Sequence, residues 1–261
     1  MTVFYNFSGG MESAAMLALD LERIRDLQAI VRFADTGKHF PEMYESIRQV
    51  EARLGIIVVR VEPRITFDQF LFERGGMLRK GCTDCSRRMK RSNLNRHAKT
   101  FPPPYEINIG FNEGEGDRAW AFAERNTRDW CKWRFPLIEK SVSRKQTEQI
   151  CREQGFSILL DMYERMGRLD CFWCPTQTDA QAAKVVQFYP DLATEWIEAE
   201  RRKGHSFKSR PLPVIAREVE NRAASEARNH CSCFGGEEEF DETASLLEPA
   251  TLGRERHVAD S

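Results

Sequence analysis

Hydrophobic and polar positions follow two alternating periods along the first sixty or so residues. Residues 2–7 (TVFYNF) are β-branched and aromatic, which is typical of a strand, and residues 11–21 carry apolar side chains at helical spacing. The cycle repeats with a strand at residues 27–33, a helix that begins near Pro41, and a third strand at residues 56–61. Strands separated by helices of this length pair in parallel through right-handed crossovers. The pattern predicts an open, mostly parallel α/β sheet flanked by helices.

The second half of the chain is less regular. Its pattern predicts a fourth strand at residues 105–109 and helices at residues 67–72, 86–98, 143–154 and 179–203. We expect residues 1–213 to form one α/β domain with a cysteine-rich helical second half. Residues 214–261 are polar and acidic, and we expect this tail to be partly disordered over roughly its last 25 residues.

Composition narrows the class of protein. The 261 residues are 41% hydrophobic with a mean hydropathy of -0.55, which is typical of a globular chain. A net charge of -1 excludes a global electrostatic attraction to nucleic acid, although it leaves room for a local patch. The N-terminal stretch lacks the pattern of a signal peptide, and no apolar run is long enough to span a membrane. We therefore expect a cytoplasmic chain with no membrane contact.

A glycine turn separates the first strand from the first helix. At this junction free backbone N–H groups and the positive end of a helix dipole converge, so an anion such as phosphate fits there. The candidate binding residues are Ser8, Gly9, Gly10, Glu12 and Ser13. The Glu12 carboxylate could hold a magnesium ion or order a lysine. The same sequence also suits a capped β-to-α turn that binds nothing.

A second loop leaves the sheet at the end of the second strand. Ligands of open α/β sheets bind at the carboxyl ends of the strands, which places Asp35, Thr36 and Gly37 beside the first loop. The alternative is that Asp35 only caps a turn.

Four of the eight cysteines form two C-x-x-C pairs, Cys82 with Cys85 and Cys171 with Cys174. A reducing compartment does not preserve structural disulfides, so this number of cysteines points to metal binding or reactivity. Four thiolates satisfy either a tetrahedral zinc ion or a cubane iron–sulfur cluster, and the spacing does not choose between them. Two unrelated pairs of free cysteines are the remaining alternative.

These motifs resemble those of a known superfamily. Residues 8–13 (SGGMES) resemble the S-G-G-x-D-S PP-loop of the adenine nucleotide alpha-hydrolases, with Glu12 in place of aspartate. Residues 35–42 (DTGKHFPE) are similar to the D-T-G-x-x-F-P-E-T segment of the phosphoadenosine-phosphosulfate (PAPS) reductase family, with Met43 replacing the threonine. The resemblance implies a Rossmann-like sheet and an adenine nucleotide as ligand, either PAPS, adenosine phosphosulfate (APS) or ATP with magnesium.

The resemblance adds further site residues. Arg88 matches an arginine that follows the family's first cysteines and would pair with sulfate or phosphate, although a solvated helix face also explains it. Gly110 and Arg118 match a strand-end glycine and an arginine that help to hold the nucleotide. Relatives of the APS reductase type hold a [4Fe-4S] cluster with similarly ordered cysteines. Here the C-x-x-C spacing of the first pair suits zinc equally well.

The resemblance implies an oxidoreductase that releases sulfite from a sulfonucleotide. In such enzymes a C-terminal thiolate attacks the substrate's sulfur, and a thioredoxin-type thiol resolves the product. The candidate nucleophiles here are Cys231 and Cys233. One alternative is a PP-loop ATP pyrophosphatase or sulfurtransferase that modifies a nucleic acid or nucleoside. Another is a non-catalytic nucleotide-binding protein with structural zinc. Basic residues around the first cysteine pair, with Trp120, Trp130 and Trp133 downstream, form the one segment suited to a polynucleotide.

Overall fold

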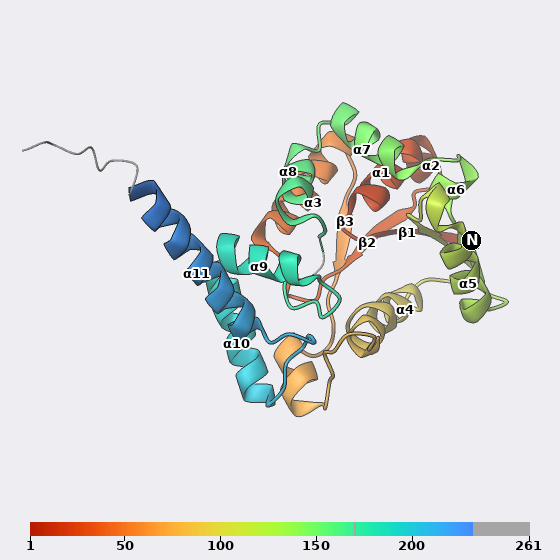
Figure 1. Cartoon of the computed structure of the whole chain (residues 1–261). Coiled ribbons are helices and arrows are strands. Elements are labelled where there is room, and N and C mark those ends of the chain that lie inside the picture. The colour runs from red at the N-terminus through yellow and green to blue at the C-terminus, as the bar shows by residue number, and fades with distance from the viewer. Residues whose placement is uncertain (170, 232–261) are drawn as a thin grey trace, which may run out of the picture. The chain divides into compact units, whose positions relative to one another are not determined.

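The computed structural model describes residues 1–169 and 171–231. Its centre is a sheet of five strands in the order β3-β2-β1-β4-β5, and every neighbouring pair is parallel (Figure 1). The strands are β1 (Thr2–Phe7), β2 (Ile30–Ala34), β3 (Val58–Val61), β4 (Tyr105–Ile109) and β5 (Cys131–Arg134). The predicted open parallel α/β sheet is confirmed. β5 was not expected from the sequence.

Helices cover both faces of this sheet. In Figure 1 α1, α3, α7 and α8 lie together on one side, and α4 and α5 lie on the other. The α-helices are α1 (Met11–Leu19), α2 (Leu21–Asp26), α3 (Pro41–Leu54), α4 (Ser92–Ala98), α5 (Gly116–Asn126), α6 (Pro136–Glu139), α7 (Arg144–Glu153), α8 (Ser157–Met166), α9 (Asp179–Phe188), α10 (Pro190–Lys203) and α11 (Leu212–Cys231). Shorter turns are the π-helical η1 (Gln69–Glu73) and η2 (Ser86–Arg91) and the 3-10 turn η3 (Glu113–Glu115).

The single helix predicted over residues 179–203 is wrong. It is two helices, α9 and α10, because Pro190 has no backbone N–H to continue α9 and instead occupies the first turn of α10. The chain divides into two compact units, Met1–Glu220 and Asn221–Ser261, and the cavities described below lie in the first. The tail predicted to be disordered lies outside the described residues from 232 onward. In the described part, no helix has the length and apolar composition needed to cross a bilayer.

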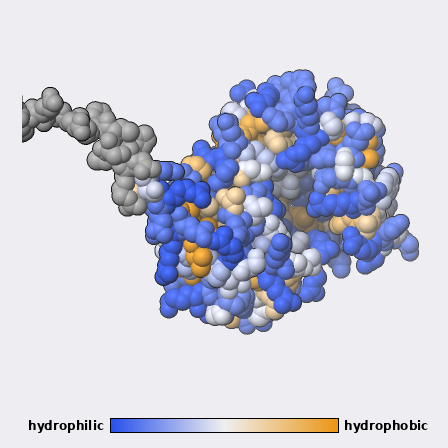
Figure 2. All heavy atoms as spheres, in the orientation of Figure 1, coloured by the Kyte–Doolittle hydropathy of each residue, from blue (hydrophilic) through white to orange (hydrophobic). Residues whose placement is uncertain are grey.

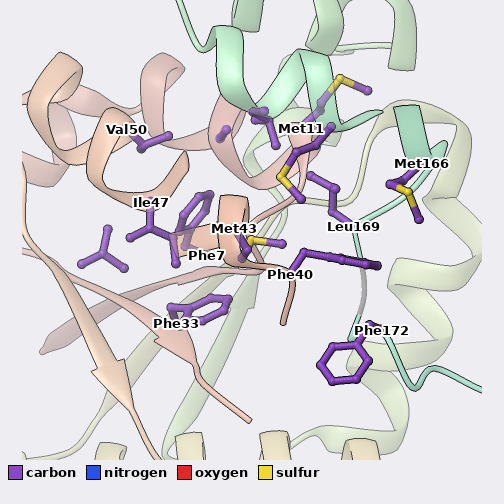
Figure 3. Packing of buried hydrophobic residues seen from close by; sticks show 14 of the residues in the cluster. Phe7, Met11, Phe33, Phe40, Met43, Ile47, Val50, Met166, Leu169 and Phe172 are labelled. Atoms are coloured by element: carbon purple, nitrogen blue, oxygen red, sulfur yellow. The ribbon is translucent and has the colours of Figure 1, made fainter. Parts of the chain in front are cut away.

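The main core lies between the sheet and the helices on the α1 and α3 side. Successive strand residues point to opposite faces, so Tyr5 and Phe7 enter this core while Phe4 joins a smaller cluster on the other face. Figure 3 shows Phe7 and Phe33 from the strands facing Ile47 of α3. Because both faces are covered, the strand ends and the loops beyond them are left to form a site.

Asp20 anchors the loop after α1 and gives a test of the fold. This carboxylate is 4% exposed, pairs with Arg134 and Lys140, and accepts a hydrogen bond from the Tyr5 hydroxyl. Burial raises the pKa of Asp20, but the hydrogen bonds from Lys140 and Arg134 outweigh burial and hold the pKa below its usual value.

We expect Asp20→Asn to lower the free energy of unfolding by about 3 kcal/mol near neutral pH. Because the folded-state pKa is depressed, this stabilisation is present above the unfolded pKa and is lost as pH falls through the folded pKa. The difference between wild type and variant should therefore narrow in acid, measured by urea unfolding. Asp161→Asn, a change at an exposed position, should leave stability unchanged.

Candidate functional site

The loop between β1 and α1 has the form of an anion cradle. Gly9 has a φ of 82°, and a Cβ there would meet Met43 Sδ at 2.2 Å, so glycine is required. The Ser13 hydroxyl accepts the backbone N–H of Ser8 and donates to the Gly10 carbonyl, which closes the loop. No side chain caps α1, whose first turn therefore presents its N–H groups to a ligand.

A cavity of about 460 Å³ opens over this loop. It is lined by six of the residues that the sequence proposed for nucleotide binding: Ser8, Gly10, Glu12, Ser13, Gly110 and Arg118. The carboxyl end of β4 presses directly on the loop here. A Cβ on Gly110 would lie 2.9 Å from the Glu12 carbonyl oxygen and 2.9 Å from the backbone nitrogen of Ser13.

Glu12 is already paired within this cavity. Its Oε1 accepts a hydrogen bond of 2.7 Å from Arg144 Nη1, and the Arg144 guanidinium lies over the ring of Tyr163. A magnesium ion at Glu12 would have to compete with this guanidinium. Sequence reasoning missed Arg144. The available signal was its place as the first residue of a helix capped by Ser143.

The second loop adjoins the first without lining the same cavity. Asp35 Oδ1 accepts the backbone N–H of Gly37 and the hydroxyl of Tyr44, each at 2.9 Å, so Asp35 does cap this turn. All three predicted residues, Asp35, Thr36 and Gly37, line a separate cavity of about 560 Å³. Thr36 also reaches the cysteines, because its Oγ1 lies 3.1 Å from Cys171 Sγ.

His39 is a buried neutral residue of this loop. It is 6% exposed, and its Nε2 lies 3.3 Å from Thr36 Oγ1. Burial, assisted by the positive charge of Lys90, lowers the pKa of His39 to about 4.

We expect the wild-type protein to lose up to about 3 kcal/mol of stability through His39 on acidification, because the unfolded histidine binds a proton first. A lowered folded-state pKa means that this loss begins near pH 6.5 and is complete near pH 4. Chemical unfolding across this range measures it, with His39→Gln as the comparison. If the free energy of unfolding falls equally with pH in both proteins, groups other than His39 cause the loss of stability.

The structure brings the two cysteine pairs to one cavity. Cys82, Cys85, Cys171 and Cys174 all line a space of about 350 Å³, together with the ring of Trp173. Burial, together with the neighbouring Cys171 and Cys174, raises the pKa of Cys85 to about 11. The Cys85 thiol therefore lies in a partly buried setting beside the second cysteine pair.

The donor set suits a metal centre by type and number. Within residues 1–169 and 171–231, no three His, Cys, Asp or Glu side chains are arranged to hold one metal ion. A single zinc needs thiolate sulfurs about 3.8 Å apart, given Zn–S bonds of about 2.3 Å in a tetrahedron. A cubane cluster binds each thiolate to a different iron and so accepts a wider spacing. The four thiols share one cavity, and their lining positions alone do not choose between the two centres.

Three basic side chains, Lys90, Arg118 and Arg168, line both the loop cavity and the cysteine cavity. The neighbouring Cys171, more than any other group, raises the pKa of Lys90, and burial opposes this effect. A cationic wall therefore separates the anion cradle from the thiols. Lys90 and Arg168 were not among the residues chosen from the sequence.

Arg88 lines neither of these cavities. Its guanidinium contacts Asp84 Oδ2 at 3.4 Å and lies 4.9 Å from the centre of the Phe70 ring. Cys231 ends α11, but its side chain and all of Cys233 lie outside the described part of the chain. Both cysteines remain predictions.

Comparison with known proteins fits this geometry. Residues 2–110 match the family model of the phosphoadenosine phosphosulfate reductase domain. Over these residues, which are less than half of the chain, the sequence is similar to the PAPS reductase family. The match covers β1 to β4, the glycine loop, the second loop and the first cysteine pair. The second pair and the residues after it lie beyond the match.

A related protein of Methanocaldococcus jannaschii is uncharacterised. It is 24% identical over 209 residues, which cover 77% of this chain and 48% of that protein, so the chain spans about half the length of this relative.

Three solved structures are similar to this chain at low sequence identity. A PAPS reductase from Candida auris in a phosphate complex is 16% identical, with a TM-score of 0.43, and the match covers 62% of this chain and 78% of that one. The U34-tRNA thiolase NcsA from Methanococcus maripaludis with its [4Fe-4S] cluster is 15% identical, with a TM-score of 0.44 and coverage of 85% and 71%. An NH3-dependent NAD synthetase from Campylobacter jejuni in complex with nitrate is 14% identical, with a TM-score of 0.39 and coverage of 95% and 89%. Their names describe three different reactions, and none of them decides the reaction of this chain.

Proposed function

We propose that this chain is an enzyme that binds an adenine nucleotide over residues 8–13 and performs sulfur chemistry on it at the adjoining cysteine cavity. The observation that carries the proposal is the wall of Lys90, Arg118 and Arg168, which lines both cavities. Phosphate and sulfate oxygens bound there would form charge-assisted hydrogen bonds with these side chains. The substrate's sulfur then lies on the thiol side of the wall.

The reaction that this arrangement favours is reduction of a sulfonucleotide to sulfite. A cysteine thiolate attacks the substrate's sulfur, the bond from sulfur to the phosphate oxygen breaks, and the nucleotide phosphate leaves. A second thiolate attacks the cysteine S-sulfonate, which releases sulfite and forms a disulfide for a thioredoxin-type thiol to reduce. Cys231 and Cys233 are the proposed nucleophiles. The pairing of Glu12 with Arg144 supports this reaction over magnesium-dependent chemistry.

The four cysteines of the cavity are the proposed ligands of a [4Fe-4S] cluster, with zinc as the alternative. A cluster held by these four thiolates would supply redox capacity beside the sulfur. The chain's own groups exclude water from this place. Trp173 is 2% exposed and packs edge-on against Phe67, and Leu78 is 1% exposed on the same cavity wall.

A sulfurtransferase that adenylates a nucleic acid or nucleoside with ATP and magnesium is the second candidate. The uncapped N-terminus of α1 suits ATP as well as PAPS. The two reactions differ in product, because the sulfurtransferase releases pyrophosphate and the reductase does not.

The test uses the full chain purified without oxygen. We expect sulfite from PAPS or APS with a thiol reductant, and no pyrophosphate from ATP with magnesium. Lys90→Met should weaken sulfonucleotide binding by about tenfold through loss of a charge-assisted contact. Lys145→Met, a change on the exposed surface of α7, is the matched control. Pyrophosphate without sulfite would favour the sulfurtransferase, and failure to bind any adenine nucleotide would refute both.

A further inference from the structure

Two further cavities adjoin the cysteine cavity, one nearer to it and one farther from it, and the farther one shares Asn6 with the loop cavity. The nearer one, of about 480 Å³, shares Thr83, Ser86 and Arg118 with the cysteine cavity. The farther one, of about 270 Å³, shares Arg91 and Phe122 with the nearer one. We call these three adjoining cavities the basic groove. In the view of Figure 2, the molecule is hollowed between the sheet and α4, with hydrophilic residues around the hollow.

The lining of the basic groove has one sign of charge. Arg32, Arg91, Lys99, Arg125 and Arg128 line its two outer cavities, and no aspartate or glutamate lines any of the three. The chain as a whole has a net charge of -1. Positive charge is therefore concentrated in this groove, and this charge attracts anions.

Most of these cations have no carboxylate to neutralise them. Among residues 1–169 and 171–231, none of Arg91, Lys99, Arg125 and Arg128 forms an ion pair, whereas Arg118 pairs with Glu115. A solvated basic surface usually pairs with nearby acidic side chains, as Arg118 does. The unpaired guanidinium and ammonium groups are available to an external anion.

Arg32 makes the strongest case. It is 1% exposed, and its guanidinium donates to Asn6 Oδ1 and to the Leu94 carbonyl at 2.8 Å each, 4.0 Å from the centre of the Phe4 ring. No carboxylate of the described residues pairs with it. A buried cation without a counter-ion is costly to the fold. An anion in the farther cavity, which Arg32 lines, would offset this cost.

Aromatic rings line the outer cavities together with the cations. Trp130 is 41% exposed and lines the farther cavity with Trp133, and Phe122 lines both outer cavities. Grooves that bind single-stranded nucleic acid combine positive charge along the phosphates with rings on which bases stack. A mononucleotide would fill one cavity, whereas three adjoining cavities suit a ligand with several linked phosphates.

We propose that a single-stranded polynucleotide lies along the basic groove, with one nucleotide of the strand presented to the cysteine cavity. The proposal rests on the proposed nucleotide site at residues 8–13, because the groove ends beside it. The polynucleotide would be the substrate itself or would carry the nucleotide on which the enzyme acts.

The test measures binding of a fluorescein-labelled single-stranded RNA of about twelve nucleotides by anisotropy, over a series of salt concentrations. The main variant combines Lys99→Ala, Arg125→Ala and Arg128→Ala, which touch neither the loop cavity nor the cysteine cavity. The matched control combines Arg48→Ala, Lys145→Ala and Arg217→Ala, which remove equal charge from exposed positions outside the groove. Trp130→Ala tests stacking.

We expect the main variant to reduce the slope of log K against log salt by about 2, and the control to leave it unchanged. Trp130→Ala should weaken RNA binding by about tenfold. Equal losses in main variant and control, no binding by the wild type at low salt, or equal binding of inorganic polyphosphate would overturn the proposal. Binding of adenosine 3′,5′-bisphosphate by each variant is measured separately. If the wild type does not bind this bisphosphate, the nucleotide site at residues 8–13 is refuted instead.

Discussion

Gly110→Ala should strongly weaken the binding of adenine nucleotides. The added Cβ would lie 2.9 Å from the Glu12 carbonyl oxygen, from Ser13 Cα and from the Ser13 backbone nitrogen. These are backbone atoms, so no side-chain rotation relieves the overlap, and the loop itself must shift. A shift that removes one charge-assisted hydrogen bond to phosphate costs about 1.5–3 kcal/mol. We therefore expect binding to weaken by about 10- to 100-fold, measured by isothermal titration calorimetry.

The same substitution at Gly116 is the control for this experiment. Gly116 has a φ of -50°, and an added Cβ would meet nothing within 4 Å. Gly116→Ala should preserve nucleotide binding and, at the start of α5, leave stability unchanged or slightly higher. Wild-type affinity in folded Gly110→Ala would show that the phosphates bind elsewhere.

The alternating strands and helices of the first half could be predicted from the sequence because each segment shows the apolar pattern of a strand or of a helix, and not a mixture of the two. β1 has six residues, all of them buried or half-buried. β5 was missed although its sequence, Cys-Lys-Trp-Arg, alternates apolar and charged residues, because it has only four residues and so short a run is a weak signal for a strand. It exists as a strand because β4 pairs with it from Tyr105 to Asn108, a contact that no local pattern shows.

The place of Lys90 in the cationic wall could not be predicted because it depends on an unusual helical turn. An α-helix over residues 86–98 would have placed Arg88 nearest to Cys85, since residues three apart share a face. Residues 86–91 instead form the π-helical turn η2, whose wider turn brings residues five apart together. Lys90, five residues after Cys85, lines the cysteine cavity in place of Arg88.

Loss of any one of the four cavity cysteines should remove most of the proposed cluster. A cubane is held by four thiolates, one from each cysteine. We expect about four iron atoms per chain in the wild type purified without oxygen, and fewer than about one in Cys85→Ala or Cys174→Ala. Iron and sulfide analysis together with the visible absorbance spectrum measures this. The two variants come from different C-x-x-C pairs, so a joint loss shows that both pairs serve one centre.

Cys131→Ala is the matched control, because Cys131 is a buried cysteine that lines the farther cavity of the basic groove and not the cysteine cavity. It should keep the full iron content. If the wild type contains one zinc ion and no iron, and both variants lose the zinc, the site binds zinc and the proposed cluster is refuted. Full metal content in Cys85→Ala and Cys174→Ala would mean that the two pairs do not share a metal, since neither pair alone supplies four ligands.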